Sequence, residues 1–307
     1  MPPGRFIICF DYELAWGRFD KVFDERYLAQ VRLTRTKSVP SLLEILDRHH
    51  LPATWAVVGH LMLHECDGVH AHLDPYRPPH FPDWFSRDCG GVDDGNSVWM
   101  ARDTIERIVS CRTPQELASH SFSHVDFAMT ELTRERARQE LELTRQQIAG
   151  FGQKMVSHVF PRGRSGHLDV LKELGVQVYR IAYREQSPRR ARFAPKLKQF
   201  VAEAWPFTPP LVELALDEYG MLGVEGGMFF SRHGHRRVIP MSSRVARVRK
   251  GLDAAVQRSG VSLLWSHPGD FAGNPTPMLA GFEEICQRAA KLREMGKLEI
   301  VPLRGLA

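Results

Sequence analysis

The chain has 307 residues, of which 43% are hydrophobic and 25% charged, as expected of a globular protein with a sizeable core. The 41 basic and 36 acidic residues leave a net charge of +5, too small to indicate nucleic-acid binding. No apolar stretch approaches the roughly 20 residues of a membrane span, and no secretory leader precedes the first apolar run. The five cysteines are widely spaced, which is typical of reduced thiols. We therefore expect a cytoplasmic protein without a transmembrane segment.

Segments with strand-like and helix-like patterns alternate along the chain. Short apolar runs predict strands at 6–10, 51–59, 116–119, 156–161, 176–179, 224–230, 261–265 and 298–302. Helical periodicity predicts helices at 24–50 with a break at Pro40, 98–110, 131–149 after an N-cap at Thr130, 167–174, 242–258 and 277–295. This alternation predicts a parallel sheet with helices outside it, an α/β fold in a single domain spanning residues 1–307.

Two longer segments interrupt this alternation. Residues 60–97 are rich in histidine, proline, glycine and aromatic residues, so we expect an insertion that forms a partly ordered, solvated substrate loop. Its His70-x-His72 and Asp93-Asp94 pairs could indicate a second metal site, but we favour the loop interpretation. Residues 184–220 are basic and punctuated by proline, and we expect them to be irregular.

The chain is organised around two histidines, His120 and His124, that follow the predicted strand 116–119. Histidine is the commonest transition-metal ligand, and this spacing brings both rings to one side of a helical turn or tight loop. A carboxylate usually completes such a pair, and the first strand runs directly into Asp11 and Glu13. An isolated His-x-x-x-His pair is more often structural than metal-binding, so the prediction of a metal site depends on other ligand residues close to the pair.

Two further polar residues, Arg162 and His267, also follow predicted strands. In a barrel of parallel strands, side chains at the carboxyl ends converge on one face. The common position of the acids, the histidines and the arginine therefore favours a catalytic site over unrelated surface residues.

In this order, the residues resemble the polysaccharide deacetylase family, which comprises metal-dependent carbohydrate esterases built on a distorted (β/α) barrel. The resemblance covers residues 5–303 and rests on Asp11-Tyr12-Glu13, His120-Ser121-Phe122-Ser123-His124, Phe160-Pro161-Arg162-Gly163 and Leu264-Trp265-Ser266-His267-Pro268. Two features depart from the family pattern. The usually adjacent acids are separated by Tyr12, as in some relatives that act on small amides or imides. The family's Asp-and-Trp motif has no clear counterpart, Trp205 being a weak candidate.

The resemblance implies a set of roles for these residues. One divalent metal ion, preferably Zn²⁺, would be held by Glu13, His120 and His124, although the spaced acids leave open which of the two binds it. Asp11 would be the general base, Arg162 would pair with Asp11 and keep it ionised, and His267 would be the general acid. The substrate-binding candidates are Tyr12, Trp16 and Trp265.

The resemblance further implies a hydrolase that removes an N-acetyl group from an acetamido sugar, in surface-polysaccharide metabolism. Basic residues cluster at 184–192 and 232–250; we favour a solvated face, with attraction to a phosphate-linked sugar as the functional alternative. Two other functions stay open from the sequence. One is hydrolysis of a small cyclic amide or imide, which the spaced acids favour. The other is a non-catalytic sugar-binding barrel.

Overall fold

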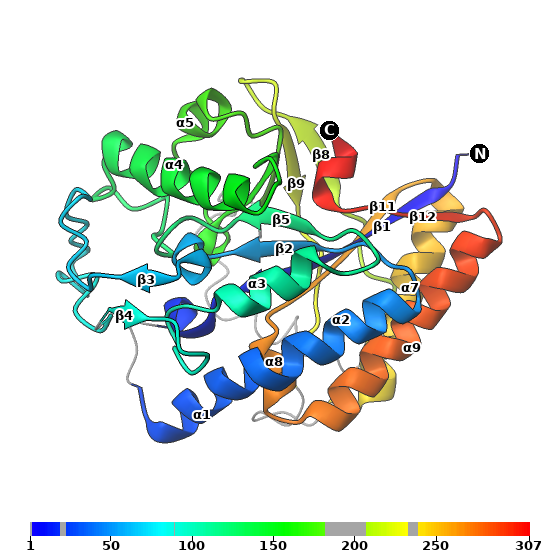
Figure 1. Cartoon of the computed structure of the whole chain (residues 1–307). Coiled ribbons are helices and arrows are strands. Elements are labelled where there is room, and N and C mark those ends of the chain that lie inside the picture. The colour runs from blue at the N-terminus through cyan, green and yellow to red at the C-terminus, as the bar shows by residue number, and fades with distance from the viewer. Residues whose placement is uncertain (1, 19–22, 89, 182–206, 233–238) are drawn as a thin grey trace.

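The computed structural model describes residues 2–18, 23–88, 90–181, 207–232 and 239–307. Within these residues, ten strands form one sheet in the order β10-β11-β1-β2-β5-β6-β7-β9-β8, and β12 adds to the start of β1. All neighbours are parallel except β8 and β9. The sheet curls into an open barrel whose two edges are β10 and β8 (Figure 1). The predicted α/β barrel is confirmed.

The strands of this sheet are short apart from the central β1. They are β1 (Gly4–Tyr12), β2 (Thr54–Val57), β5 (Glu116–Ser119), β6 (Ser157–Val159), β7 (Val178–Ile181), β8 (Glu213–Leu216), β9 (Leu222–Glu225), β10 (Met228–Phe229), β11 (Val261–Ser266) and β12 (Leu298–Ile300). A separate antiparallel ribbon joins β3 (Glu65–Cys66) to β4 (Gly91–Val92).

The main helices cover the outside of the barrel. They are α1 (Glu25–Leu33), α2 (Val39–Arg48), α3 (Arg102–Val109), α4 (Arg134–Gly150), α5 (Leu168–Glu173), α7 (Met241–Arg258), α8 (Gly269–Ala272) and α9 (Pro275–Glu294). In Figure 1, α2, α7 and α9 lie together below the sheet, whereas α4 and α5 stand above it. A π-helical turn at Thr34–Ser38 joins α1 to α2, so the expected break near Pro40 is a change of helix type.

Side chains alternate along each strand between the barrel interior and the helices. A small apolar cluster inside the barrel includes Ile7 and Cys9 of β1. A larger cluster between sheet and helices contains the other side of β1, namely Phe6, Ile8, Phe10 and Tyr12. The same alternation directs Asp11 into the barrel and the ring of Tyr12 towards the helices.

Several expected boundaries were wrong. The N-cap of α4 is Thr133, whose side chain accepts from the Arg136 amide, and not Thr130. The predicted strand 224–230 is two strands, β9 and β10, because Gly226 and Gly227 both adopt positive φ angles and interrupt it. In the predicted irregular segment 184–220, residues 184–206 lie outside the described residues, and the remainder contains β8.

Candidate active site

The candidate catalytic residues converge at the carboxyl ends of three strands in one part of the sheet. Asp11 and Glu13 come from the end of β1, His120 from the residue after β5, and His267 from the residue after β11. Because β11, β1, β2 and β5 are adjacent and parallel, their ends open at the same edge of the sheet. The fold thus brings together residues that lie more than 100 positions apart in the chain.

Glu13 is the centre of this group. Its Oε1 atom lies 3.1 Å from Nε2 of His120 and 3.1 Å from Nε2 of His124. Nε2 of His267 lies 3.6 Å from the same oxygen. Both histidines of the pair are almost fully buried. The three donor atoms of Glu13, His120 and His124 lie within 4.8 Å of one another, a spacing at which they could share one metal ion.

The hydrogen bonds of His120 show that the group of Glu13, His120 and His124 suits a bound cation. Its Nδ1 atom donates to the Val159 carbonyl oxygen at 2.7 Å, because that oxygen can only accept. In the neutral ring, Nε2 then turns a lone pair towards Glu13 Oε1, which also only accepts when ionised. A metal ion or an additional proton between these two atoms must offset the repulsion between the two acceptors. Two imidazoles and one carboxylate are a common ligand set for divalent transition metals, with positions left open for other ligands.

The loop that carries the histidines is held in an unusual conformation. Ser121 and His124 have φ angles of 57° and 59°, a region that residues other than glycine seldom adopt. Glu140 of α4 anchors the loop, since its carboxylate accepts from the Ser123 amide at 2.7 Å and from the Ser123 hydroxyl at 2.6 Å. The conformation is therefore fixed from outside the loop.

Glu140 is fully buried and pairs with Arg136, one turn earlier on the same helix. Helical periodicity predicted this helix in the sequence but singled out neither residue. A carboxylate and a guanidinium four residues apart look like an ordinary surface ion pair in sequence. Only the fold shows that this pair supports the histidine loop.

Asp11 makes a buried ion pair with an arginine that the sequence analysis also missed. Arg180 of β7 donates to Asp11 Oδ2 at 2.5 Å, and both side chains are nearly inaccessible. The expected partner was Arg162, which lies in a 3-10 turn after β6 and is exposed. A buried carboxylate requires a partner at the same depth, and the inward-facing Arg180 supplies it. The pairing predicted for Arg162 is corrected accordingly.

Electrostatics within the group reflect its burial and its mixed charges. Burial raises the pKa of Glu13, but His267, His124 and the hydrogen bonds to it together hold that pKa well below its usual range. Burial lowers the pKa of His124, and the charge of Arg162 adds to this effect although Glu13 opposes it. For His267, burial is outweighed by Glu13 and by Asp270, whose Oδ2 lies 3.3 Å from Nδ1, so its pKa is raised well above normal.

Gly17 allows Glu13 to reach the histidines. A Cβ atom at this position would lie only 1.7 Å from Glu13 Oε2 and 2.7 Å from its Cδ. The backbone of the short 3-10 helix Leu14–Arg18 therefore occupies the space next to the carboxylate. Any larger residue at Gly17 would have to displace the Glu13 side chain.

A cavity of about 640 Å³ opens beside this group. Asp11, Glu13 and His267 all line it. Other lining residues are Tyr27, Gln30, Phe229, Arg232 and Arg244. A volume of this size is typical of a small-molecule binding site. Acids, a histidine and cations thus face one space large enough for a sugar residue.

The three candidate substrate-binding aromatics lie in different surroundings. Trp16 is buried and donates its indole N–H to the Trp99 carbonyl oxygen at 3.1 Å, so it belongs to the core and its expected role is corrected. Tyr12 borders the cavity, but its side chain is fully buried and its ring packs edge-on against Trp55. Strand alternation directs this ring away from Asp11.

Trp265 lies closer to the reacting groups. Its ring stacks on Phe229 at a centroid distance of 4.3 Å, and the Arg180 guanidinium lies 4.8 Å from its centre. Phe229 lines the cavity. Trp205, the weak candidate for the missing motif, lies outside the described residues.

Comparisons with known proteins agree with this fold. The sequence profile of the family described as polysaccharide deacetylase matches residues 21–179, just over half of the chain. The chain therefore belongs to the polysaccharide deacetylase family and is a hydrolase of amide or acetyl bonds. This confirms the resemblance drawn from the sequence and does not favour the alternative of a non-catalytic sugar-binding barrel. No curated protein matches the chain.

Solved structures with the same fold are distant in sequence. A protein from Mycobacterium smegmatis assigned to the polysaccharide deacetylases superposes with a TM-score of 0.64 and 15% identity, covering 100% of this chain and 92% of that one. A similarly assigned protein from Pseudomonas aeruginosa PAO1 gives 0.60 and 12%, covering 97% and 87%. Puue allantoinase gives 0.60 and 10%, covering 98% and 91%. At these identities the likeness establishes the fold alone.

Among the helices that the structure describes, none is both long and apolar enough to cross a membrane.

Proposed function

We propose that this protein is a metal-dependent deacetylase that removes the N-acetyl group of an acetamido sugar. The observation that carries the proposal is the meeting of Glu13, His120 and His124 donor atoms beside the cavity that Asp11 and His267 line. The ion would be divalent, with Zn²⁺ preferred because two imidazoles and a carboxylate are common zinc ligands. We further propose a place in surface-polysaccharide metabolism and in the cytoplasm, which the family and the free thiols of the described cysteines support.

Asp11 and Glu13 would have different roles because their surroundings differ. Glu13 contacts both histidines through one oxygen, which suits a metal ligand. Asp11 has no such contact with them and is held by Arg180, which suits a carboxylate that accepts a proton from the attacking water. When bound, the metal ion would polarise the acetyl carbonyl and lower the pKa of the water. Arg180 is then a positioning residue that keeps the charge of Asp11 stable inside the barrel.

His267 would protonate the departing amine. Its Nε2 atom faces Glu13, and its ring is held from the other side by Asp270. The raised pKa of His267 suits a group that must carry a proton near neutral pH. Trp265 is proposed to act on the substrate indirectly, by supporting Phe229 in the cavity wall.

Arginine side chains also line the cavity and would influence which substrate binds there. Arg18, Arg232 and Arg244 line it together with the acids. Positive side chains of this kind favour an anionic group on the ligand, and a phosphate-linked acetamido sugar remains the form of substrate to test first. The basic residues at 232–250 that suggested a phosphate-linked sugar in the sequence include Arg232 and Arg244 of this cavity.

The test is acetate release from a panel of acetamido sugars, with and without a phosphate group. Asp11→Asn should lose about 10²–10⁴-fold in rate while it retains metal, because only the proton acceptor is removed. Glu13→Gln should instead lose metal. A matched control is Glu284→Gln, which alters an exposed carboxylate on α9.

Two results would count against the proposal. If Asp11→Asn lost metal and Glu13→Gln kept it, the roles of the two acids would be reversed. If no acetamido sugar released acetate but cyclic amides were opened, the site would belong to a cyclic amide or imide hydrolase.

A further inference from the structure

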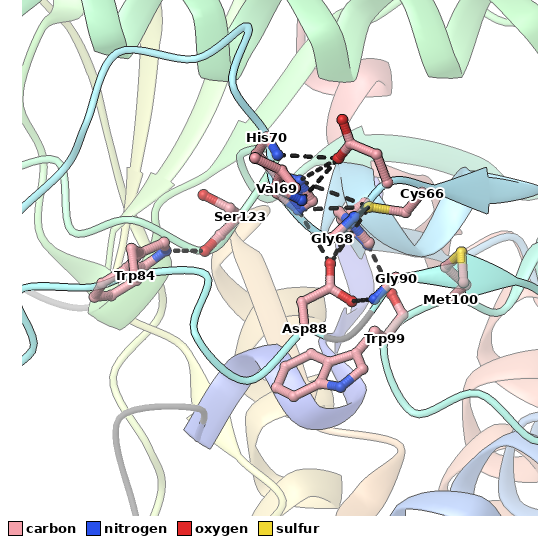
Figure 2. A network of polar contacts seen from close by, with 12 residues as sticks. Cys66, Gly68, Val69, His70, Trp84, Asp88, Gly90, Trp99, Met100 and Ser123 are labelled. Atoms are coloured by element: carbon pink, nitrogen blue, oxygen red, sulfur yellow. Dashed lines mark hydrogen bonds and ion pairs between the residues drawn. The ribbon is translucent and has the colours of Figure 1, made fainter.

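A second group of metal-ligand side chains lies in the segment after β2, away from the catalytic group. It consists of His60, Cys66, His70 and Asp88, whose donor atoms all lie within 4.8 Å of one another. The side chains of His60, His70 and Asp88 are at most 2% exposed. Figure 2 shows the side chains of Cys66, His70 and Asp88 turned towards one another.

The distances within this group approach those of a tetrahedral zinc shell. Cys66 Sγ lies 3.3 Å from His60 Nε2, 3.6 Å from His70 Nε2 and 3.5 Å from Asp88 Oδ2. Zinc–ligand bonds of about 2.0 to 2.3 Å place the ligand atoms of a tetrahedron roughly 3.3 to 3.6 Å apart. Asp88 Oδ2 lies closer to the rings, at 2.9 Å from His60 and 3.0 Å from His70. All four donor atoms lie within 4.8 Å of one another, which puts them within reach of one ion.

The charges of the four groups also suit a divalent ion. A thiolate and a carboxylate supply two negative charges, which balance the two positive charges of Zn²⁺, and the two imidazoles bind as neutral ligands. Net neutrality is important here because a buried site strongly disfavours uncompensated charge. Two histidines, one cysteine and one aspartate are all established zinc ligands.

The surrounding backbone fixes the ligands in place. The His60 ring is oriented by its Nδ1 atom, which donates to the Trp99 carbonyl oxygen at 3.0 Å. The Gly68 amide donates to Cys66 Sγ at 3.3 Å. The Gly90 amide donates to Asp88 Oδ1 at 3.1 Å, leaving Oδ2 to face the other ligands. Outer contacts of this kind orient ligands in metal sites.

The turn that presents His70 depends on positive φ angles and on Asp67. Asp67 Oδ1 accepts from the amides of Val69 and His70 at 2.9 and 3.0 Å. Gly68 and His70 have φ angles of 74° and 56°. Gly90 has a φ of 68°, and a Cβ there would lie 2.7 Å from the Cys66 carbonyl oxygen. This local geometry brings the chain back on itself so that the four side chains meet.

We propose that His60, Cys66, His70 and Asp88 bind a structural zinc ion, separate from the catalytic metal. Four protein ligands would complete the shell, as in structural sites, whereas the catalytic group offers three and leaves room for substrate. The segment 60–97 is a partly exposed loop, as expected, and of the residues that suggested a second metal site only His70 belongs to this group, since His72 is exposed. His60 and His70 are buried, and Asp93 instead pairs with Arg35 at 2.8 Å.

The ion would hold a segment that has little regular structure of its own. Between η3 (Gly59–Met62) and α3, the described residues contain only the two-residue strands β3 and β4. This segment packs on the catalytic histidine loop. The Trp84 indole donates to the Ser123 carbonyl oxygen at 2.9 Å, and the His60 amide donates to the Phe122 carbonyl oxygen at 2.9 Å (Figure 2 draws the Trp84 bond). A cross-link here would stiffen the wall behind His120 and His124.

Cobalt substitution tests the proposal independently of catalysis. A cobalt(II) ion bound to the Cys66 thiolate should show a sulfur-to-metal charge-transfer absorption in the near ultraviolet. The catalytic group contains no sulfur and cannot produce this signal. We expect the absorption in the cobalt-loaded full chain and in Cys111→Ser, which removes another partly buried thiol. Its complete loss is expected in Cys66→Ser.

Zinc content measured in a second variant tests the structural site even if Cys66→Ser does not fold. The double variant His120→Ala/His124→Ala should retain one equivalent of zinc and, when loaded with cobalt, the charge-transfer absorption. A full chain without that absorption, or a double variant that binds no zinc, would overturn the proposal. If the deacetylase assignment failed instead, acetate release would be absent while the sulfur signal remained.

Discussion

Replacing Gly17 by alanine should weaken metal binding at the catalytic group without unfolding the protein. The new methyl group would lie 1.7 Å from Glu13 Oε2, where an ordinary carbon–oxygen contact is about 3.4 Å. The carboxylate must therefore move by roughly 1.7 Å, well beyond the ~0.5 Å tolerance of a functional site. The displaced atoms are the flexible end of a side chain, so the backbone can stay in place.

The expected loss of zinc affinity is the loss that displaced or disoriented ligands typically cause in metal sites. We expect about 10–100-fold weaker binding, equivalent to roughly 1.4–2.7 kcal/mol. The assay is the zinc concentration that restores acetate release to chelator-treated protein, compared with the unmodified chain treated in the same way, because Gly17→Ala leaves the His60, Cys66, His70 and Asp88 group unchanged. Gly150→Ala is the matched control, because it lies at the end of α4 and a Cβ there meets no atom within 4 Å.

An unchanged zinc requirement in folded Gly17→Ala would refute the assignment of Glu13 as a metal ligand. The thermal unfolding midpoint of the variant provides the check on folding. A large drop in that midpoint together with lost activity would mean that the methyl group disturbs the core instead of the carboxylate.

Three further predictions concern the groups around the proposed metal. Arg180→Met leaves the charge of Asp11 buried without its partner and should cost about 3–5 kcal/mol in urea denaturation, whereas the exposed Arg249→Met should cost at most ~1 kcal/mol. Equal costs would refute the buried ion pair. His267→Ala should severely reduce amide hydrolysis but spare an activated acetyl ester, whose leaving group needs no proton; equal losses would remove His267 as the acid. Asp270→Asn removes a carboxylate that raises the pKa of His267, so the alkaline limb of amide hydrolysis should move to lower pH, and an unmoved limb would contradict this.

The fold and the main catalytic residues could be predicted because their signals are local in the sequence. The predicted strands are short apolar runs, and Asp11, His120 and His267 come within a residue or two of such runs. Parallel strands bring their carboxyl ends to one edge, so the convergence follows from topology without knowledge of distances. Strand alternation could also have placed the Tyr12 ring away from Asp11, and that argument was available from the sequence.

The remaining contacts depend on pairs that no local pattern connects. Arg180 and Asp11 are 169 residues apart, and only the curled sheet sets them at the same depth. Arg162 follows a strand as the expected partner would, but it lies beyond the strand end and is exposed. The His60, Cys66, His70 and Asp88 group has no standard ligand spacing and is assembled by left-handed turns that the sequence does not specify.

The most direct test of the account is metal reconstitution of acetate release. Full-length protein freed of metal by a chelator is titrated with zinc in the presence of an N-acetylglucosamine oligomer, alongside the His120→Ala/His124→Ala variant. We expect that chelation abolishes acetate release and that zinc restores it in the unmodified chain. The folded variant should stay inactive at every zinc concentration. Acetate release that persists without metal, or that returns in the variant, would contradict a catalytic metal at Glu13, His120 and His124.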